Sequence, residues 1–281
     1  MSATGDAQAT AKDLEVTEIK LKHIEEAKKA KKRFVLWVSL VWVGIFAFLL
    51  IIFNQFNLDF RFMLKYLPFI MKGVGTTIYV SLLSIISACV LALFGALGRL
   101  SKNPIFYGIA TFYISIIRGT PLIVQIFVIY LGLPQMGIVI SAVPAGIIAL
   151  GVNYGAYMTE IFRAGIQSIG RGQIEAAHSL GMTYAQMMKR VVLPQALRLI
   201  IPPTGNEFIA MLKDSALVNF LGVWELFFRA IKVGRQNFKN METLIIAGLF
   251  YWMVTIIFQY FQSRLENRLS KGTRQVSGMT H

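Results

Sequence analysis

Charged residues and cysteine are both scarce in this sequence of 281 residues. Only 15% of the residues are charged, whereas about a quarter are charged in a typical soluble domain. The one cysteine, Cys89, lies inside an apolar block, which excludes an intrachain disulfide and a cluster of thiolate metal ligands. The mostly polar start and the long first apolar block also argue against a cleavable secretory signal.

Apolar residues dominate the composition of the sequence. They make up 56% of the sequence and occur in long uncharged blocks, which cannot be the alternating faces of a soluble core. The formal charge is +14, but the basic residues lie between these blocks and not across a polar face interleaved with aromatics. This pattern predicts an all-α integral membrane protein and argues against nucleic acid as a partner.

Six membrane-spanning helices are expected. Three blocks are clean enough to cross about 30 Å of hydrocarbon as single helices: Phe34–Phe53, Gly75–Gly98 and Thr243–Phe261. Three longer or interrupted blocks supply the other spans: Pro104–Pro134, Ile138–Phe162 and Pro194 to about Phe228.

Two of the longer blocks can be divided. If the residues before Arg118 form an interfacial helix, then Gly119–Gly137 is long enough to cross and Arg118 marks its cytoplasmic end. We favour this interpretation over a position of Arg118 at the midplane. In the fifth block, Gln195–Lys213 is long enough to cross, Pro202 and Pro203 should distort the helix, and Asp214–Phe228 forms a second piece near the outer face.

Basic residues predict the orientation. Most of the 28 lysine and arginine residues fall on one side if both termini are cytoplasmic, as the positive-inside rule requires. One segment does not fit this orientation, because it places four basic residues outside, between the last two spans: Arg229, Lys232, Arg235 and Lys239. Such a basic outer rim is either a docking surface for an acidic partner, a funnel for anions or simply solvated charge.

The cytoplasmic connection at about residues 168–194 is long for a simple link between two helices. It reads as a first short helix around Glu175–Leu180, a stop at Gly181 and a second helix capped by Thr183, with Pro194 ending or kinking the second and starting the next span. A projecting pair of helices suits a groove on a cytoplasmic partner. Ala176 and Ala177 would let another backbone come close.

Part of this connection has a recognisable pattern. Glu175-Ala176-Ala177, then Gly181, Val191 and Leu193-Pro194, resembles the EAA loop of permease subunits of binding-protein-dependent ATP-binding cassette (ABC) importers. Val191 stands where the family usually has isoleucine. The resemblance implies that this loop docks on an ATP-binding subunit.

Neighbouring segments narrow the resemblance to permeases for polar amino acids. It covers roughly Gly73 to Leu265 and rests on residues 113–125, Ala156-Tyr157, residues 160–166, residues 193–198, Asn206-Glu207 and Lys213-Asp214-Ser215. It implies a type I importer fold with five core spans, so the helix at 34–53 is an addition. The expected parts are a charged segment 1–33, the extra helix 34–53, the core 73–265 and a cytoplasmic tail 266–281.

ATP hydrolysis is expected on another chain, because no Gly-x-x-x-x-Gly-Lys-Ser/Thr loop occurs here. The resemblance implies a dimer of ATP-binding subunits carrying ATP and Mg, a second permease that is the same or a related chain, and an extracytoplasmic solute-binding protein. It also implies the cytoplasmic membrane of a bacterium. No catalytic residue, metal site or bound cofactor is expected in this chain.

Ionisable and polar groups inside the spans are candidates for the translocation pathway or gate, since each needs a partner or a water-filled path. They are Arg118, Thr120, Gln125, Glu160, Asn206, Glu207, Lys213 and Asp214. The alternative is that they hold helices together, and Glu160 with Arg163 has the spacing of an intrahelical pair.

The sequence leaves the substrate open. The basic outer rim favours zwitterionic or acidic amino acids such as glutamate, glutamine or cystine, while basic amino acids and opines remain possible substrates. A carrier driven by an ion gradient would show inverted halves, which are not seen. A membrane protein with no transport role would not need the cytoplasmic loop.

Overall fold

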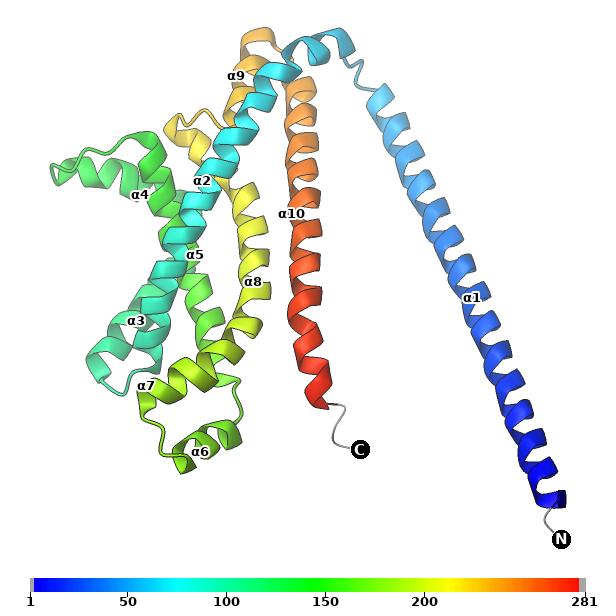
Figure 1. Ribbon diagram of the computed structural model, residues 1–281. Coiled ribbons are helices and arrows are strands. Elements are labelled where there is room, and N and C mark those ends of the chain that lie inside the picture. Colours follow the sequence, from blue (N-terminus) through cyan, green and yellow to red (C-terminus); the bar gives the residue numbers. More distant parts are fainter. Residues whose placement is uncertain (1–2, 278–281) are drawn as a thin grey trace. The chain divides into compact units, whose positions relative to one another are not determined.

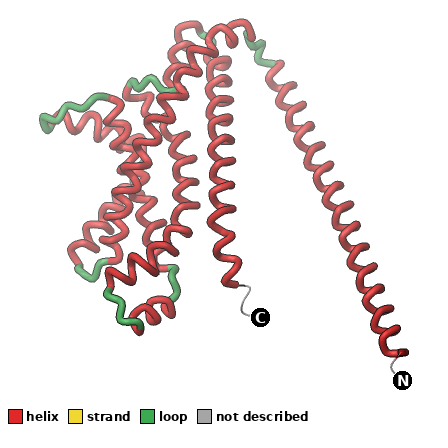
Figure 2. Tube along the Cα trace, viewed as in Figure 1, coloured by secondary structure: helices red, strands yellow, loops and turns green. Residues whose placement is uncertain are grey.

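The computed structural model describes residues 3–277, and within this range the chain is helical with no strand. Figure 2 shows how little of the described chain lies in loops. The chain divides into two compact units, Met1–Asp59 and Phe60–His281. We call the second the core unit.

The first unit is built around one continuous helix, α1 (Ala3–Asn54). Its segment Glu25–Ile52 is long and apolar enough to cross a membrane, and none of its most apolar window is buried. The extra helix expected at 34–53 is therefore present. The helix does not begin there, however, because the charged segment before it continues the same helix.

The core unit contains nine further α-helices, and Figure 1 places them along the chain. They are α2 (Phe60–Leu100), α3 (Pro104–Arg118), α4 (Leu122–Gln135), α5 (Ala142–Gln167), α6 (Arg171–Ser179), α7 (Tyr184–Met187), α8 (Leu193–Asp214), α9 (Leu226–Asn237) and α10 (Asn240–Ser277). A π-helical turn, η1 (Met188–Val192), precedes α8, and a 3-10 turn, η2 (Ser215–Leu221), follows it.

The centre of the core unit is the packing of α2 against α5, which glycines allow to be close. A Cβ atom at Gly95 would clash with Thr159 Oγ1, and one at Gly151 would clash with Ser87 Oγ. Small residues let helix backbones approach in this way inside a membrane. Around this contact lies the main buried cluster, which includes Ala88, Ala92, Leu150, Met158 and Met211.

By length and composition, three helices in the described part of the chain could cross a membrane, or four if the bent pair α3 and α4 is one span. The two others in the core unit, α5 with 26 residues and α8 with 22, are about 39 and 33 Å long at 1.5 Å per residue. Their polar residues keep them outside that set. The count of six spans therefore stays a prediction, while the all-α membrane architecture is confirmed.

The division of the third block at Arg118 is confirmed, because α3 ends there, but the expected single crossing helix over Gly119–Gly137 is wrong. A position of α3 at the membrane interface stays a prediction. α3 packs lengthwise between α2 and α5, because Arg99 Nη1 donates to Thr111 Oγ1 at 2.7 Å and Tyr113 Oη donates to the Val152 carbonyl at 2.7 Å. The chain then bends by 107° into α4. With 14 residues, α4 is about 21 Å long and too short to cross alone.

The division expected in the fifth block is confirmed, since α8 ends at Asp214 and η2 begins at Ser215. The expected distortion at Pro202 and Pro203 is milder, because α8 continues through both. The side chain of Gln262 on α10 donates to the Pro202 carbonyl at 2.6 Å and lies against Gly205, so a neighbouring helix supports the proline segment.

Candidate functional site

A pocket of about 360 Å³ opens between the start of α4, the middle of α5 and the last turns of α8. Its lining is unusually polar for a protein with so few charges. It comprises Thr120, Pro121, Leu122, Asn153, Tyr154, Tyr157, Glu207 and Asp214. Three of the six polar lining residues, Thr120, Glu207 and Asp214, are sequence-based candidates, and α5 supplies the other three.

Two carboxylates, Glu207 and Asp214, line this pocket, and one guanidinium, that of Arg118, lies beside it. Asp214 Oδ2 accepts a 2.8 Å hydrogen bond from Tyr154 Oη, which orients the carboxylate. Arg118, the last residue of α3, stacks over the Tyr157 ring with its guanidinium carbon 5.0 Å from the ring centroid. The pocket therefore offers partners for an anionic and a cationic group at the same time.

The bend between α3 and α4 places Arg118 and Thr120, and Gln125 holds the bend. Its amide nitrogen donates to the Ile117 carbonyl at 2.7 Å, to the Thr120 carbonyl at 3.1 Å and to Thr120 Oγ1 at 2.9 Å. Its carbonyl oxygen accepts from Asn153 Nδ2 at 3.0 Å. Gln125 is thus buried behind the pocket wall as a support, where sequence analysis had grouped it with the pathway residues.

The structure separates the remaining candidates. Thr120, Glu207 and Asp214 line the pocket, and Arg118 lies beside it against the lining residue Tyr157. Asn206 and Lys213 lie outside the lining. Sequence analysis missed three pocket residues on α5: Asn153, Tyr154 and Tyr157. They follow one another at i, i+1 and i+4 within an apolar block, a spacing that puts them on one side of a helix.

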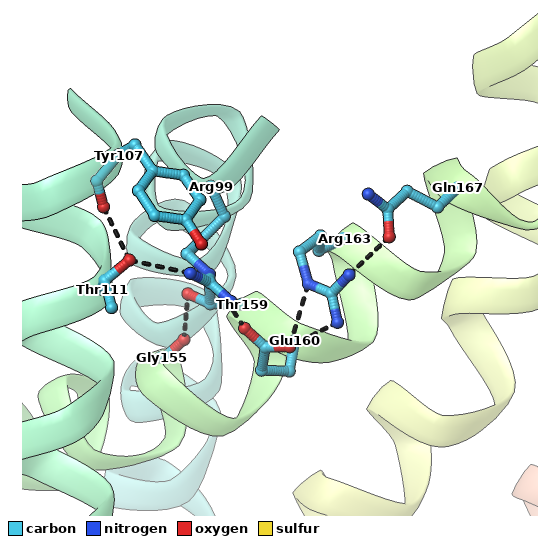
Figure 3. Close-up of polar contacts among 8 residues, drawn as sticks. All are labelled: Arg99, Tyr107, Thr111, Gly155, Thr159, Glu160, Arg163 and Gln167. Atoms are coloured by element: carbon cyan, nitrogen blue, oxygen red, sulfur yellow. Dashed lines mark hydrogen bonds and ion pairs between the residues drawn. The ribbon is translucent and has the colours of Figure 1, made fainter. Parts of the chain in front are cut away.

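Glu160 lies elsewhere, in a network that joins α2, α3 and α5 (Figure 3). Its Oε2 accepts from Arg163 Nε at 2.9 Å and from Arg163 Nη2 at 2.7 Å, so the expected intrahelical pair is present. Its Oε1 lies 3.4 Å from Arg99 Nε. Arg99 also stacks over Tyr107, with its guanidinium carbon 4.9 Å from the ring centroid.

The loop at 168–194 folds largely as the sequence predicts, although α6 begins at Arg171, before the expected start near Glu175. Gly181 adopts a left-handed conformation with φ of +71° after α6, and Thr183 caps α7 in a capping box with Gln186. Pro194 stands in the first turn of α8, directly after η1, so it marks the start of the span without interrupting the helix. We call the loop with α6, α7 and η1, residues 168–194, the knob. It has its own apolar centre, which is completed by the start of α8 and made by Ile169, Ala177, Met187, Val192, Ala196 and Ile200.

The residues matched to the EAA loop differ in exposure. Glu175, Ala176, Leu193 and Pro194 are exposed, whereas Ala177 is buried in the knob itself. Two apolar side chains at the tip, Leu180 and Tyr184, are 76% and 70% exposed. Sequence analysis did not single them out, although exposed apolar residues on a polar loop are typical of a protein interface.

The opposite end of the core unit carries α9, as Figure 1 shows. The buried Glu225 caps this helix by accepting from the amides of Phe227 and Phe228 and from Tyr251 Oη at 2.7 Å. Arg229 and Lys232 stack over Trp224, with Lys232 Nζ 4.0 Å from the ring centroid. The basic outer rim predicted from sequence therefore includes an ordered helix whose cations rest on aromatic faces.

Residues 82–271 match the family model described as binding-protein-dependent transport system inner membrane component. The arginine transport system permease protein ArtQ of Bacillus subtilis is 40% identical over 214 residues, which cover 76% of this chain and 98% of that protein. The L-cystine transport system permease protein TcyB of Bacillus subtilis is 38% identical over 205 residues, covering 73% and 88%.

Solved structures give the same fold. A chain of an amino acid ABC transporter crystallised with histidines superposes with a TM-score of 0.71 at 42% identity, covering 75% of this chain and 99% of that one. A chain of the inward-facing MetNI methionine ABC transporter gives a TM-score of 0.63 at 20% identity, covering 73% and 98%, and supports the fold alone.

Proposed function

This chain belongs to the family of binding-protein-dependent transport system inner membrane components, and on that premise we propose that it moves polar amino acids through the pocket between α4, α5 and α8. It is the permease subunit of an ABC importer for amino acids, a transport component and not the enzyme. ATP is hydrolysed on a separate subunit. The proposal concerns which residues meet the substrate and which substrates fit.

The observation that carries the proposal is a pocket lined by Glu207 and Asp214 with Arg118 beside it, stacked over the lining residue Tyr157. A free amino acid carries a carboxylate and an ammonium group, so its recognition needs a cationic and an anionic partner. Arg118 offers the planar fork that suits a carboxylate, and Glu207 or Asp214 suits the ammonium. The volume of about 360 Å³ lies within the usual range for sites of small ligands, about 300–1,000 Å³.

The charge balance of the pocket favours amino acids with a cationic side chain. One carboxylate is sufficient for the α-ammonium group, which leaves the second for another positive charge. The outer rim suggested zwitterionic or acidic substrates, but those cations lie at α9, whereas Glu207 and Asp214 line the pocket itself. The name of one relative, an arginine transport permease, agrees with this preference.

The expected partners follow from the two ends of the core unit. The knob of α6 and α7 presents Glu175, Ala176, Leu180 and Tyr184 to a dimer of ATP-binding subunits, which hold ATP and Mg. The basic helix α9 faces the extracytoplasmic solute-binding protein. A second permease, the same or a related chain, completes the pathway. We further propose that both termini are cytoplasmic, as the distribution of basic residues predicts, and that the protein lies in a bacterial inner membrane.

The mechanism then needs only rigid movements. When ATP closes the ATP-binding subunits, the knob moves with them and the helices that wall the pocket rock between two orientations. ATP biases the two states only by the difference in its binding free energy between them. Because Glu207 and Asp214 lie on α8 and Arg118 on α3, relative movement of these helices changes the spacing between the cationic and anionic partners.

The test uses the complete complex, co-purified with its ATP-binding subunit and reconstituted in liposomes with binding protein. We expect ATPase stimulation by arginine or lysine, lost in Glu175→Lys and kept in Gln173→Lys, an exposed control on the same helix. In Glu207→Gln, half-maximal stimulation should need about tenfold more substrate, as expected for one lost charge-assisted contact. The exposed neighbour control, Asn206→Ala, should behave as wild type.

Two results would contradict these expectations. If Glu175→Lys leaves ATPase coupling intact, the knob is not the docking element. If neutral, acidic and basic amino acids stimulate equally and Glu207→Gln changes nothing, the pocket does not select the substrate.

A further inference from the structure

We infer that Glu160 is a positioning residue, and that its contact with Arg99 is a releasable link which passes movement of the knob to the substrate pocket. This inference rests on the proposed function, because it assigns a route between the two ends of the permease. The contacts of Glu160 with Arg99 and Arg163 are unequal in strength, and they add little to the stability of the fold. The contact with Arg99 joins two helices and can be broken at low cost.

The contacts of Glu160 are unequal. Arg163 holds one carboxylate oxygen with two hydrogen bonds of 2.9 and 2.7 Å, both within α5. Arg99, which reaches across from α2, contacts the other oxygen with a single 3.4 Å interaction. A distance of 3.4 Å is long for an N–H···O bond, whose usual range ends near 3.2 Å. The link between helices is therefore the weaker one.

Stability alone does not explain the arrangement. The side chains of Arg99, Glu160 and Arg163 are 20%, 23% and 27% exposed, so all three are partly desolvated. Partly buried ion pairs contribute little net stability, because desolvation offsets their attraction. One arginine would also be sufficient to neutralise one carboxylate. The second arginine adds a connection between helices and not a needed neutralisation.

The position of the link connects the two functional ends. On one side, α5 continues from Glu160 to its end at Gln167, and α6 of the knob begins four residues later, at Arg171. On the other side, Arg99 is bonded to Thr111 on α3, and α3 ends at Arg118 beside the pocket. Displacement of the end of α5 can thus reach α3, and so the guanidinium at the pocket, through the pair Arg99 and Glu160.

The link can also open without leaving the carboxylate unpaired or the Arg99 guanidinium without a hydrogen-bond partner. If Arg99 moves away, Glu160 keeps Arg163, and Arg163 keeps Gln167 Oε1 (Figure 3). Arg99 in turn keeps Thr111 Oγ1 at 2.7 Å and the face of Tyr107. Because breaking a buried pair is costly mainly through the uncompensated charge, these secondary partners make release inexpensive. The geometry is that of a contact made in one transport state and opened in the other.

The test compares three variants in the reconstituted complex. Arg99→Gln should lower the maximal rate of substrate-driven ATPase and uptake by about tenfold, as loss of one charge-assisted contact predicts, and leave the KM for arginine unchanged. Arg163→Gln, which removes only the contact within α5, should retain coupling. Arg99→Lys should restore part of the rate. All three should have the Tm of wild type.

A second measurement does not depend on altering the network. Spin labels at the exposed positions Lys102, between α2 and α3, and Ser168, at the end of α5, report the separation of the two sides. With Cys89→Ser as background, we expect this separation to differ between the nucleotide-free and ATP-trapped complexes. An unchanged separation would overturn the releasable link.

The outcomes separate the two proposals. Suppose that arginine stimulates wild type, and that Arg99→Gln and Arg163→Gln behave alike or Arg99→Gln raises KM with no effect on rate. The network then has no coupling role, and the proposed function stands. If no amino acid stimulates wild type, the proposed function fails, and the coupling role of the network fails with it.

Discussion

Tyr154 on α5 donates a 2.8 Å hydrogen bond to Asp214 at the end of α8, and this bond ties two walls of the pocket together. The tyrosine is 4% exposed, so its hydroxyl has no easy access to bulk water. The bond therefore fixes the direction in which the Asp214 carboxylate faces the pocket.

Tyr154→Phe should raise the KM for substrate about tenfold, because a hydrogen bond to a charged group contributes about 1.5–3 kcal/mol. The ring is kept, so the core packing should change little. Tyr113→Phe is the matched control: its hydroxyl donates to the Val152 carbonyl between α3 and α5, away from the pocket lining. Uptake kinetics in liposomes should separate the two, and equal KM values would remove Asp214 from substrate binding.

Gln125→Leu should destabilise the bend between α3 and α4. The substitution leaves the Thr120 and Ile117 carbonyls and the Asn153 amide without their partner in a site that is 7% exposed at Gln125. Each buried polar group left unsatisfied costs about 1–3 kcal/mol. We expect a lower Tm and weaker substrate binding together.

Thermal unfolding in detergent measures this effect. Gln236→Leu, at an exposed position near the end of α9, is the control and should keep the wild-type Tm. A Gln125→Leu protein as stable as wild type would show that water or a rearranged loop satisfies these groups.

Local signals made the cytoplasmic knob predictable from sequence. Thr183 as N-cap and Gly181 as the left-handed stop act within a few residues, so their effect does not depend on distant parts of the chain. The end of α8 at Asp214 could be predicted for a similar reason, from the length of chain needed to cross the membrane.

Tertiary contacts decided what sequence could not predict. Arg118, Gly119, Thr120 and Pro121 interrupt the apolar block at 104–134, so its division could be predicted. Nothing local fixes the 107° angle of the bend, which the hydrogen bond between Gln125 and Asn153 supports. The pocket residues Tyr154 and Tyr157 were missed because amphipathic aromatics fit an apolar span as well as a binding site. Glu160 and Arg163 could be paired from spacing, but Arg99 lies 61 positions from Glu160 and was not.

Leu180→Asp should weaken attachment of the ATP-binding subunit without affecting the fold. Leu180 is 76% exposed at the tip of the knob, where it lies outside the knob's apolar centre. Burial of a leucine side chain in an interface contributes about 1.5–3 kcal/mol, so the Kd should rise by about tenfold or more.

Co-purification and light scattering at graded concentrations measure this association. Gln173→Asp adds the same charge to the exposed face of α6 without removing an apolar group, and it should bind nearly as wild type. Equal weakening by both variants would mean that added charge, and not the lost leucine, is responsible.

Gly73→Ala should be among the most damaging small substitutions in the chain. A Cβ atom there would lie 2.5 Å from Leu226 Cα, 2.6 Å from Leu226 N and 2.8 Å from the Glu225 carbonyl carbon. These are backbone atoms at the start of α9, so no side chain can rotate away. The same backbone is held by Glu225 through its own cap and by Thr77, which accepts from the Leu226 amide at 3.3 Å.

Relief of that clash would require α9 to move away from α2, and overpacking of this kind typically costs about 1–3 kcal/mol. Gly75→Ala is the natural control, because nothing lies within 4 Å of the added atom and alanine favours a helix. We expect a clearly lower Tm for Gly73→Ala and an unchanged or slightly higher Tm for Gly75→Ala. Since α9 carries the basic outer rim, Gly73→Ala should also weaken stimulation by the binding protein. If both variants match wild type in Tm and stimulation, then α9 is not fixed against α2 as the glycine contact requires.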